Sequence, residues 1–193
     1  KSETIAKTGD KDEARKTMRA AGVPVIPGCD AVADVEEAKA QAEKIGFPLL
    51  IKARAGGGGR GIRLVKEASE LEAAYQNASR EALSAFGDGG VYMEKVLSKS
   101  DFSDLKIGDT IDEMQILCDQ YGNVVCLGER ECSIQRKNQK LIEECPSSAI
   151  DQKTREKMIE VATKAAKAVN YRNAGTVEFL FDRDGNFYFM EMN

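Results

Sequence analysis

The stretch LLIKARAGGGGRGIRLV, residues 49–65, governs the fold that we predict for this chain of 193 residues. Two short apolar runs, residues 49–53 and 62–65, are predicted strands, and four successive glycines lie between them. Because glycines leave backbone N–H groups unshielded, such a loop can close over phosphate oxygens. Lys52 before the loop and Arg60 within it add positive charge. We interpret the loop as a phosphate lid, with a plain flexible hairpin loop as the alternative.

Hydrophobic periodicity on either side of this loop predicts a small α/β unit followed by a mostly β region. The polar residues 98–112 between the two are expected to form a hinge or an exposed excursion. Helices are predicted at residues 11–21, 34–45, 69–86 and 151–169. Further strands are predicted at residues 91–97, 114–118, 124–127, 176–181 and 187–192. The predicted fold class is therefore α+β, with a small α/β domain and part of a larger antiparallel-sheet domain.

Composition and charge exclude several classes of protein. Lys and Arg number 28 against 32 Asp and Glu, the two signs are interspersed, and no basic block marks a nucleic-acid interface. The apolar runs are too short to span a membrane, and the first residues are too polar for a signal peptide. The sequence has no histidine, which excludes imidazole bases and His-ligated zinc. Its five cysteines form no CxxC pair, so we expect reduced thiols and a cytoplasmic protein.

The last predicted hairpin carries two acidic residues that we expect to face each other. The dipeptide Asp184-Gly185 favours a two-residue turn, and counting outward from it places Glu178 opposite Glu191. Facing carboxylates repel, but a divalent cation between them would make the arrangement favourable, and Mg²⁺ prefers such oxygen ligands. The alternative is a pair of solvated glutamates on an exposed face. The strand period places three further residues on the same face: Leu180, Phe189 and Asn193.

Two other polar segments are less specific. Residues 129–140 are dense in polar side chains, some of which could bind an anion, although a stretch of this kind is more often a solvated surface strand. Glu94 and Lys95 end a predicted strand beside the expected hinge, where they could bind an adenine base through hydrogen bonds. Together, these features suggest a nucleotide held between a glycine-loop lid and a sheet with acidic metal ligands.

Short motifs along nearly the whole chain resemble those of the ATP-grasp enzymes. Residue by residue, these motifs most resemble those of the biotin carboxylase family. One such motif would be weak, whereas this ordered set is highly specific. The matching motifs include Gly9-Asp10-Lys11, Leu50-Ile51-Lys52-Ala53, Gly128-Glu129-Arg130, Cys132-Ser133-Ile134-Gln135-Arg136, Gly175-Thr176-Val177-Glu178-Phe179 and Glu191-Met192-Asn193.

The resemblance implies an ATP-grasp fold and an ATP-dependent ligase. In this family, ATP and bicarbonate give carboxyphosphate and ADP, and the released CO₂ carboxylates N1 of biotin. The reaction serves acetyl-CoA carboxylase in fatty acid biosynthesis, and also propionyl-CoA and pyruvate carboxylases. The implied cofactors are ATP and Mg²⁺ or Mn²⁺, with biotin as the substrate on a carrier protein. The implied partners are bicarbonate, a biotin carrier domain, a carboxyltransferase and a second copy in a homodimer. The mitochondrial matrix is the alternative to a cytoplasmic location.

The resemblance also assigns roles to residues at matching positions. The phosphate-binding group comprises Lys11, Lys52, Gly56, Gly57, Gly58 and Gly59. The remaining nucleotide-binding residues are Glu94, Lys95 and Leu97 at a strand end, with Gln135, Asn138 and Leu180. The metal ligands would be Glu178, Glu191 and Asn193, and Lys140 would be the catalytic lysine near bicarbonate. Such chemistry works by positioning and charge neutralisation, so it needs no histidine.

The resemblance divides the chain into a linker helix and connector at 1–26, a lid at 27–97 and a truncated first part of the C-terminal ATP-grasp domain at 98–193. The family continues after its Glu-Met-Asn motif with Thr-Arg-(Leu/Ile)-Gln-Val-Glu-His, which supplies the bicarbonate base. Because the chain stops at Asn193, we expect a fragment of a biotin carboxylase without turnover. Two alternatives are another ATP-grasp ligase, such as a carbamoyl-phosphate synthetase half, and a non-enzymatic scaffold.

Overall fold

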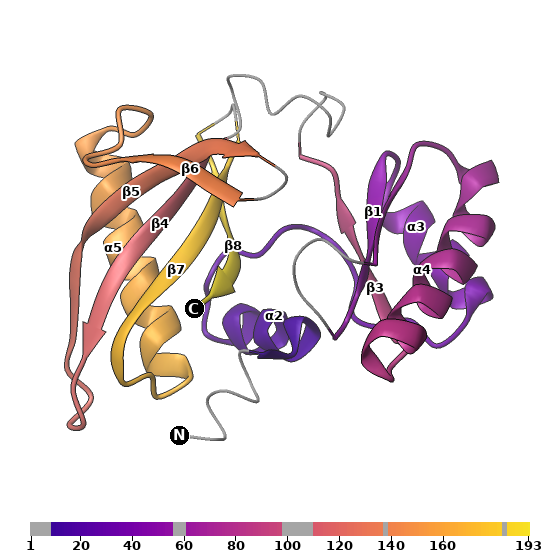
Figure 1. The fold of residues 1–193 in the computed structure, drawn as a ribbon, viewed down its shortest axis with the longest axis horizontal. Coiled ribbons are helices and arrows are strands. Elements are labelled where there is room, and N and C mark those ends of the chain that lie inside the picture. The colour runs from indigo at the N-terminus through magenta and orange to yellow at the C-terminus, as the bar shows by residue number, and fades with distance from the viewer. Residues whose placement is uncertain (1–8, 56–60, 98–109, 137–138, 183–184) are drawn as a thin grey trace. The chain divides into compact units, whose positions relative to one another are not determined.

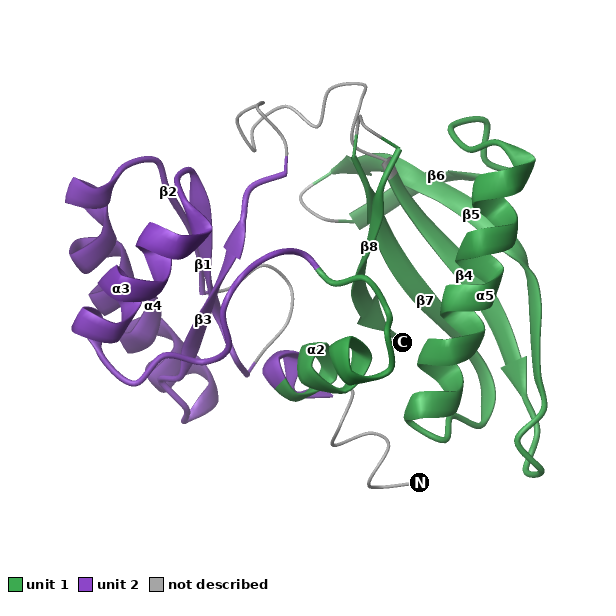
Figure 2. Cartoon of the chain, turned by 180° about the vertical axis from the view of Figure 1, so that it is seen from behind, with its two compact units in different colours: residues 1–8, 13–25, 98–193 green, residues 9–12, 26–97 purple. Residues whose placement is uncertain are grey.

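The computed structural model describes residues 9–55, 61–97, 110–136, 139–182 and 185–193. These residues divide into two compact units (Figure 2). Unit 2 contains Gly9–Asp12 and Ile26–Leu97, and unit 1 contains the other described residues. No helix in the described ranges is both long and apolar enough to cross a membrane.

Unit 2 is a three-stranded antiparallel sheet packed against helices. Its strands β1 (Leu49–Ala53), β2 (Ile62–Val65) and β3 (Val91–Lys95) lie in the order β2-β1-β3. The helices are α3 (Val35–Ile45) and α4 (Leu71–Phe86), preceded by the short η1 (Ala68–Glu70). Alternate strand residues point to the helices and form the core, which contains Ala38, Ala42, Leu49, Ile51, Val65, Leu71, Ala78, Val91 and Met93. The remaining strand faces are therefore free to carry polar side chains such as Lys52 and Glu94.

Unit 1 is a five-stranded antiparallel sheet with one long helix, α5 (Gln152–Ala168), along one face (Figure 1). Its strands are β4 (Thr110–Cys118), β5 (Val124–Arg136), β6 (Gln139–Glu144), β7 (Asn173–Phe181) and β8 (Phe187–Met192), in the order β6-β5-β4-β7-β8. Helix α2 (Lys11–Ala20) adds Ala14 and Met18 to the same core. The core between α5 and the sheet includes Met114, Ile116, Met158, Ala162, Ala165, Val177 and Phe179. The opposite face of the sheet carries the polar residues of the candidate site.

The predicted helices and the strands around the glycine loop are confirmed, but the sheet of unit 1 is larger than expected. Strand β4 begins at Thr110, so residues 110–112 belong to a strand and not to the expected hinge. Strand β5 continues to Arg136, and residues 139–144 form the additional strand β6. Their polar side chains bond to other strands of the sheet, Arg130 and Lys140 both to Glu113 on β4, which is why hydrophobic alternation did not reveal these strands. The rest of the expected hinge, residues 98–109, lies outside the described residues.

The β7–β8 hairpin differs from the prediction near its turn. The two-residue turn is wrong, because Phe181 pairs with Phe187 and the Asp182 amide donates to the Asn186 carbonyl. A β-bulge then shifts the register by one residue, so that Glu178 still pairs with Glu191. The register at the turn, with Phe181 opposite Phe187, places Phe189 opposite Phe179 in the core, not on the polar face as expected.

Burial of aromatic rings explains this choice of register. Phe187 lies edge-on to Phe179, with ring centroids 5.5 Å apart, and stacks on Phe181 at 6.1 Å. An uninterrupted register from the predicted turn would instead turn Phe189 out of the core. Since burial of a phenylalanine side chain stabilises a protein by about 1.5–3 kcal/mol, the core favours the bulged arrangement.

Candidate functional site

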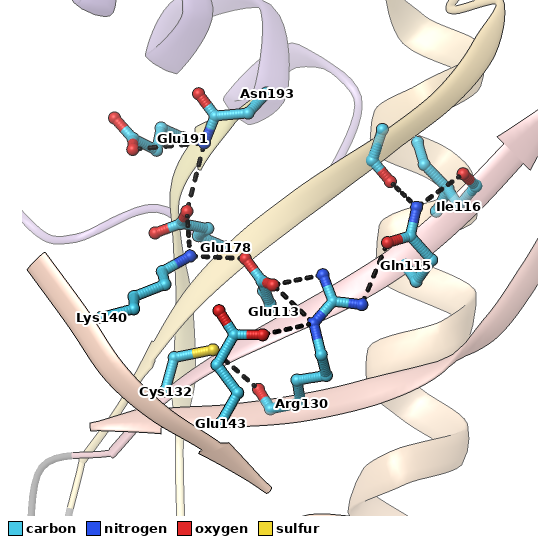
Figure 3. Close-up of polar contacts among 11 residues, drawn as sticks. Glu113, Gln115, Ile116, Arg130, Cys132, Lys140, Glu143, Glu178, Glu191 and Asn193 are labelled. Atoms are coloured by element: carbon cyan, nitrogen blue, oxygen red, sulfur yellow. Dashed lines mark hydrogen bonds and ion pairs between the residues drawn. The ribbon is translucent and has the colours of Figure 1, made fainter. Parts of the chain in front are cut away.

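Two glutamates and the amide of Asn193 form the first part of the candidate site. Glu178 on β7 and Glu191 on β8 are direct cross-strand partners. The Asn193 side-chain nitrogen donates to Glu178 Oε1 at 3.1 Å and to Glu191 Oε1 at 3.3 Å, which holds the amide between the two carboxylates (Figure 3). Asn193 is itself fixed by two backbone hydrogen bonds with Thr176. Three oxygen-bearing side chains therefore converge on one end of this hairpin.

Lys140 on β6 extends the site across the sheet. Its Nζ atom lies 2.7 Å from Glu178 Oε1 and 2.5 Å from Glu113 Oε2 on β4 (Figure 3). The Glu113 side chain is 5% exposed and that of Lys140 is 25% exposed. Lys140 therefore lies largely out of bulk water, between two buried carboxylates from different strands.

Arg130 on β5 completes the group. Its guanidinium donates to Glu113 Oε1, with Nε at 2.7 Å and a second, shorter contact from Nη2, and to Gln115 Oε1 at 3.0 Å. It also pairs with Glu143 Oε2 at 3.2 Å. Cross-strand pairing places Glu113 directly opposite Arg130, which fixes this contact through the β4–β5 register. We call Glu113, Arg130, Lys140 and Glu178 the charge cluster.

The pKa values within the charge cluster follow from burial and pairing. Burial favours the neutral form of Glu113, but hydrogen bonds from Lys140 and Arg130 outweigh it and hold the Glu113 pKa below its ordinary 4.5. Burial also opposes the charge of Lys140, yet its bonds to Glu113 and Glu178 raise the Lys140 pKa. Lys140 is therefore a fixed positive charge and not a proton acceptor at neutral pH.

The pKa of Glu113 is lowered, whereas that of Glu178 is raised. Burial raises its pKa above 4.5, Lys140 only partly offsets this, and the negative charges of Glu191 and Glu113 raise it further. Burial and the neighbouring carboxylates thus disfavour the charge of Glu178 more than Lys140 favours it. A hard cation would correct the imbalance, and the donors fit one: two carboxylates and an amide that can turn its oxygen inward.

A second group of metal-ligating atoms, from Glu113, Cys132 and Glu143, lies within 4.8 Å. Arg130 already pairs with both glutamates, so their charges are compensated by the protein. Burial and the Glu113 charge raise the Cys132 pKa to about 12, so its thiol is protonated and a poor ligand. This group does not fit a metal.

Unit 2 holds the other lysines that the sequence singled out. Lys52 on β1 forms a short ion pair with the buried Glu94 on β3. The Lys11 amide lies 3.4 Å from the carbonyl oxygen of Arg54, two residues beyond Lys52. Lys95 diverges from Glu94, because its ammonium lies against Gly46, at 3.1 Å from where a Cβ atom would be. Unit 2 therefore brings Lys11, Lys52 and Glu94 onto neighbouring segments.

The structure describes some of the other residues to which the resemblance assigns a role, but not all of them. Gln135 pairs with Lys140 across β5 and β6, and its side chain donates to the Cys132 carbonyl at 2.9 Å. Leu180 is half-buried on β7 two residues beyond Glu178, so it shares that face. Leu97 is half-buried just after β3. Asn138 and the loop residues Gly56, Gly57, Gly58 and Gly59 lie outside the described residues.

Sequence reasoning missed Glu113 and Arg130 as members of the site. Residues 113–116 alternate polar and apolar, since Glu113 and Gln115 face the site while Met114 and Ile116 enter the core. That period of two was a usable signal for a strand with a polar inner face. The predicted strand begins only at Met114, so it leaves Glu113 out.

Comparison with protein families gives a match over residues 10–193 to the family described as carbamoyl-phosphate synthase L chain, ATP binding domain. The biotin carboxylase of Nostoc is 51% identical over 99% of this chain and 41% of its own length. The chain thus spans about two fifths of the curated relatives it matches. Because the relatives at this level of identity are biotin carboxylases, they favour that reading over a carbamoyl-phosphate synthetase half.

Solved structures agree. A biotin carboxylase–βγ-ATP complex from Campylobacter jejuni matches with a TM-score of 0.90 and 49% identity, over 99% of this chain and 41% of that one. The biotin carboxylase domain dimer of a Hydrogenobacter thermophilus 2-oxoglutarate carboxylase, with MgADP, ADP and bicarbonate, matches with a TM-score of 0.87 and 48% identity, over 98% and 40%. The expected ATP-grasp fold of mixed helices and antiparallel sheets is confirmed.

Proposed function

The chain belongs to the family of the carbamoyl-phosphate synthase L chain ATP-binding domain, and from this premise we propose that it is the MgATP-binding part of a biotin carboxylase. The intact protein would use ATP and bicarbonate to carboxylate biotin through carboxyphosphate. One observation carries the proposal: Glu178 and Glu191 face each other beside Lys140 and Asn193. Burial, and then the charges of Glu191 and Glu113, raise the Glu178 pKa.

Glu178, Glu191 and Asn193 would hold the divalent metal ion. When bound, Mg²⁺ neutralises charge on the phosphate oxygens of ATP. The two carboxylates would provide the anionic ligands, and the Asn193 amide would rotate so that its oxygen replaces its nitrogen between them. The raised pKa of Glu178 supports this role, because a bound cation would offset both the burial of its charge and the repulsion from Glu191.

The lysines would handle the phosphates and bicarbonate. Lys140, held protonated by Glu113 and Glu178, is the proposed catalytic lysine, which would stabilise negative charge on bicarbonate and on the transferring phosphoryl group. Lys11, Lys52, Gly56, Gly57, Gly58 and Gly59 form the proposed phosphate-binding group. The proposed adenine and ribose contacts come from Glu94, Lys95, Leu97, Gln135, Asn138 and Leu180.

The proposed division of the chain is a linker helix and connector at residues 1–26, a lid at 27–97 and part of the larger ATP-grasp domain at 98–193. We propose biotin on a carrier domain as the acceptor, a carboxyltransferase as the downstream partner, and a homodimer, since a related biotin carboxylase domain is a dimer. A cytoplasmic location is proposed because the cysteines at 29, 118, 126, 132 and 145 are all free thiols.

Titration calorimetry of the chain with MgATP tests the core of this proposal. We expect saturable binding, and Glu178→Gln or Glu191→Gln should each weaken it about tenfold, equivalent to about 1.4 kcal/mol. The matched control is Glu160→Gln, because Glu160 forms an exposed pair with Lys164 on α5 and should leave binding unchanged. Equal affinity in all four proteins would contradict the assignment of the metal ligands.

A further inference from the structure

Arg54 lies where three segments of unit 2 meet. Its backbone N–H donates to the Gly90 carbonyl at 2.9 Å, just before β3, and its carbonyl lies 3.4 Å from the Lys11 amide at the start of α2. Arg54 follows β1 directly, two residues after Lys52. The main chain of Arg54 alone therefore contacts the segment before β3 and the start of α2, where Lys11 lies.

The Arg54 side chain reinforces the same junction. Its Nε and Nη2 atoms donate to Asp88 Oδ2 at 3.1 Å and 2.7 Å. Nε also lies 3.6 Å from Asp10 Oδ2, and Asp10 Oδ1 accepts from the Asp12 amide at 3.0 Å in the first turn of α2. The guanidinium thus connects a carboxylate in the α4–β3 loop, Asp88, to the carboxylate just before α2, Asp10.

A backbone hydrogen bond orients the Asp88 carboxylate toward Arg54. The Gly90 amide donates to its Oδ1 at 2.9 Å, so its other oxygen is directed toward Arg54. The Gly90 bond and the Arg54 guanidinium both hold the Asp88 pKa below its ordinary 3.8. A Cβ atom at Gly90 would lie 3.1 Å from Asp88 Oδ1 and 3.4 Å from Arg54 Nε, so a side chain there would press on this contact.

The division of the chain into two compact units agrees with a structural role for the contacts of Arg54. Gly9–Asp12 belong to unit 2, whereas α2 from Glu13 onward belongs to unit 1. The Arg54 contacts to Asp10 and Lys11 fall within the short segment that joins unit 2. A second bond, from the Ala31 amide to Asp12 Oδ1 at 3.3 Å, supports the same segment.

We propose that Arg54 is a positioning residue, which holds Lys11 at the start of α2 in register with Lys52 on β1. This inference rests on the proposed function, because it assigns Lys11 and Lys52 to the phosphates of ATP. Arg54 acts through Lys11: without the guanidinium, Asp10 loses its ion pair with Arg54, and the first turn of α2 keeps the 3.4 Å backbone contact but loses the side-chain contact.

The test compares Arg54→Gln with Arg63→Gln. Arg63 is a matched control, because it lies in the same unit, its side chain is 41% exposed against 40% for Arg54, and it pairs with one carboxylate, Glu81. Arg54→Gln should weaken MgATP binding about three- to fivefold, the range of an exposed ion pair. Arg63→Gln should leave the affinity unchanged, and equal effects of the two substitutions would overturn the proposal.

A double-mutant cycle shows whether Arg54 acts through Lys11. In a Lys11→Gln background, Arg54→Gln should cause no further loss of MgATP affinity. Additive losses would show that Arg54 contributes through the general field of its charge or by touching the nucleotide, and would overturn the positioning role.

Hydrogen exchange separates this inference from the proposed function. In the protein without nucleotide, Arg54→Gln should speed the exchange of the Lys11 and Asp12 amides about three- to fivefold relative to Arg63→Gln. If the chain fails to bind MgATP but this exchange still rises, the proposed function fails while the structural role of Arg54 stands. Unchanged exchange would overturn the role whatever the nucleotide result.

Discussion

Lys140 Nζ lies 2.5 Å from Glu113 Oε2, and this contact joins the edge strand β6 to the central strand β4 across the intervening β5. Both partners are largely buried, and Arg130 holds the other oxygen of the same carboxylate. A single glutamate therefore pairs with two cations in the middle of the proposed catalytic face.

Replacement of Glu113 should destabilise unit 1. Glu113→Gln leaves the Lys140 and Arg130 charges beside each other with less compensation, which should lower the free energy of unfolding by about 3 kcal/mol. Urea denaturation measures this loss, and Glu160→Gln on the exposed surface of α5 serves as the control with no measurable change. A stability of Glu113→Gln equal to that of the control would show that the contact contributes nothing net.

The stabilising effect of Glu113 should depend on pH with a defined sign. Its pKa is lower in the folded protein than the ordinary 4.5, so its contribution is complete above that value and is lost as the pH falls through the lowered folded pKa. The difference in unfolding free energy between the unsubstituted protein and Glu113→Gln should therefore shrink on acidification from about pH 7 to about pH 3.

Glu178 should show the reverse sign, because its folded pKa is raised. Without metal, its ionisation costs stability as the pH rises from 4.5 through the raised folded pKa. Glu178→Gln should thus gain stability relative to the unsubstituted protein over that interval in a chelating buffer. A constant difference across the interval would contradict the raised pKa.

The cysteines should differ sharply in reactivity. Cys145 is exposed, whereas burial raises the pKa of Cys132 to about 12, and the thiolate is the reactive form. A chromogenic disulfide reagent should modify Cys145 rapidly in the folded protein and Cys132 only after unfolding. Cys145→Ser should remove the rapid phase, and rapid loss of the Cys132 thiol in that variant would refute the expectation.

Gly175 should be intolerant of a side chain. A Cβ atom there would lie 2.3 Å from the Tyr171 hydroxyl and 2.6 Å from the Asn193 carbonyl oxygen. Gly175→Ala should cost about 1–3 kcal/mol of stability and also weaken Mg²⁺ binding, since it displaces Asn193. Gly9→Ala is the control, because nothing lies within 4 Å of its Cβ position. Stability and metal affinity equal to those of the control would contradict the crowding.

The sequence predicted the helices and the glycine-loop sheet well, because their cores follow simple periods of apolar residues. It also predicted that Glu178 faces Glu191, although the assumed two-residue turn was wrong and the β-bulge restored the register. Glu113 and Arg130 were not predicted as site residues, because their importance arises from partners on other strands. A period of two can show that Glu113 lies on the polar face of a strand, but it does not show which charged side chains of β5 and β6 meet it there.

Met190 is the extra residue of the β-bulge in β8, and its position determines where this strand can gain or lose a residue. Phe189 and Glu191 stand two positions apart, yet their side chains enter opposite faces of the sheet. Loss of Met190 would therefore leave the aromatic ring and the carboxylate each on its own side, as in a regular strand. Loss of Tyr188 would instead turn Phe187 away from its ring partners, so length changes in homologous hairpins should cluster at Met190.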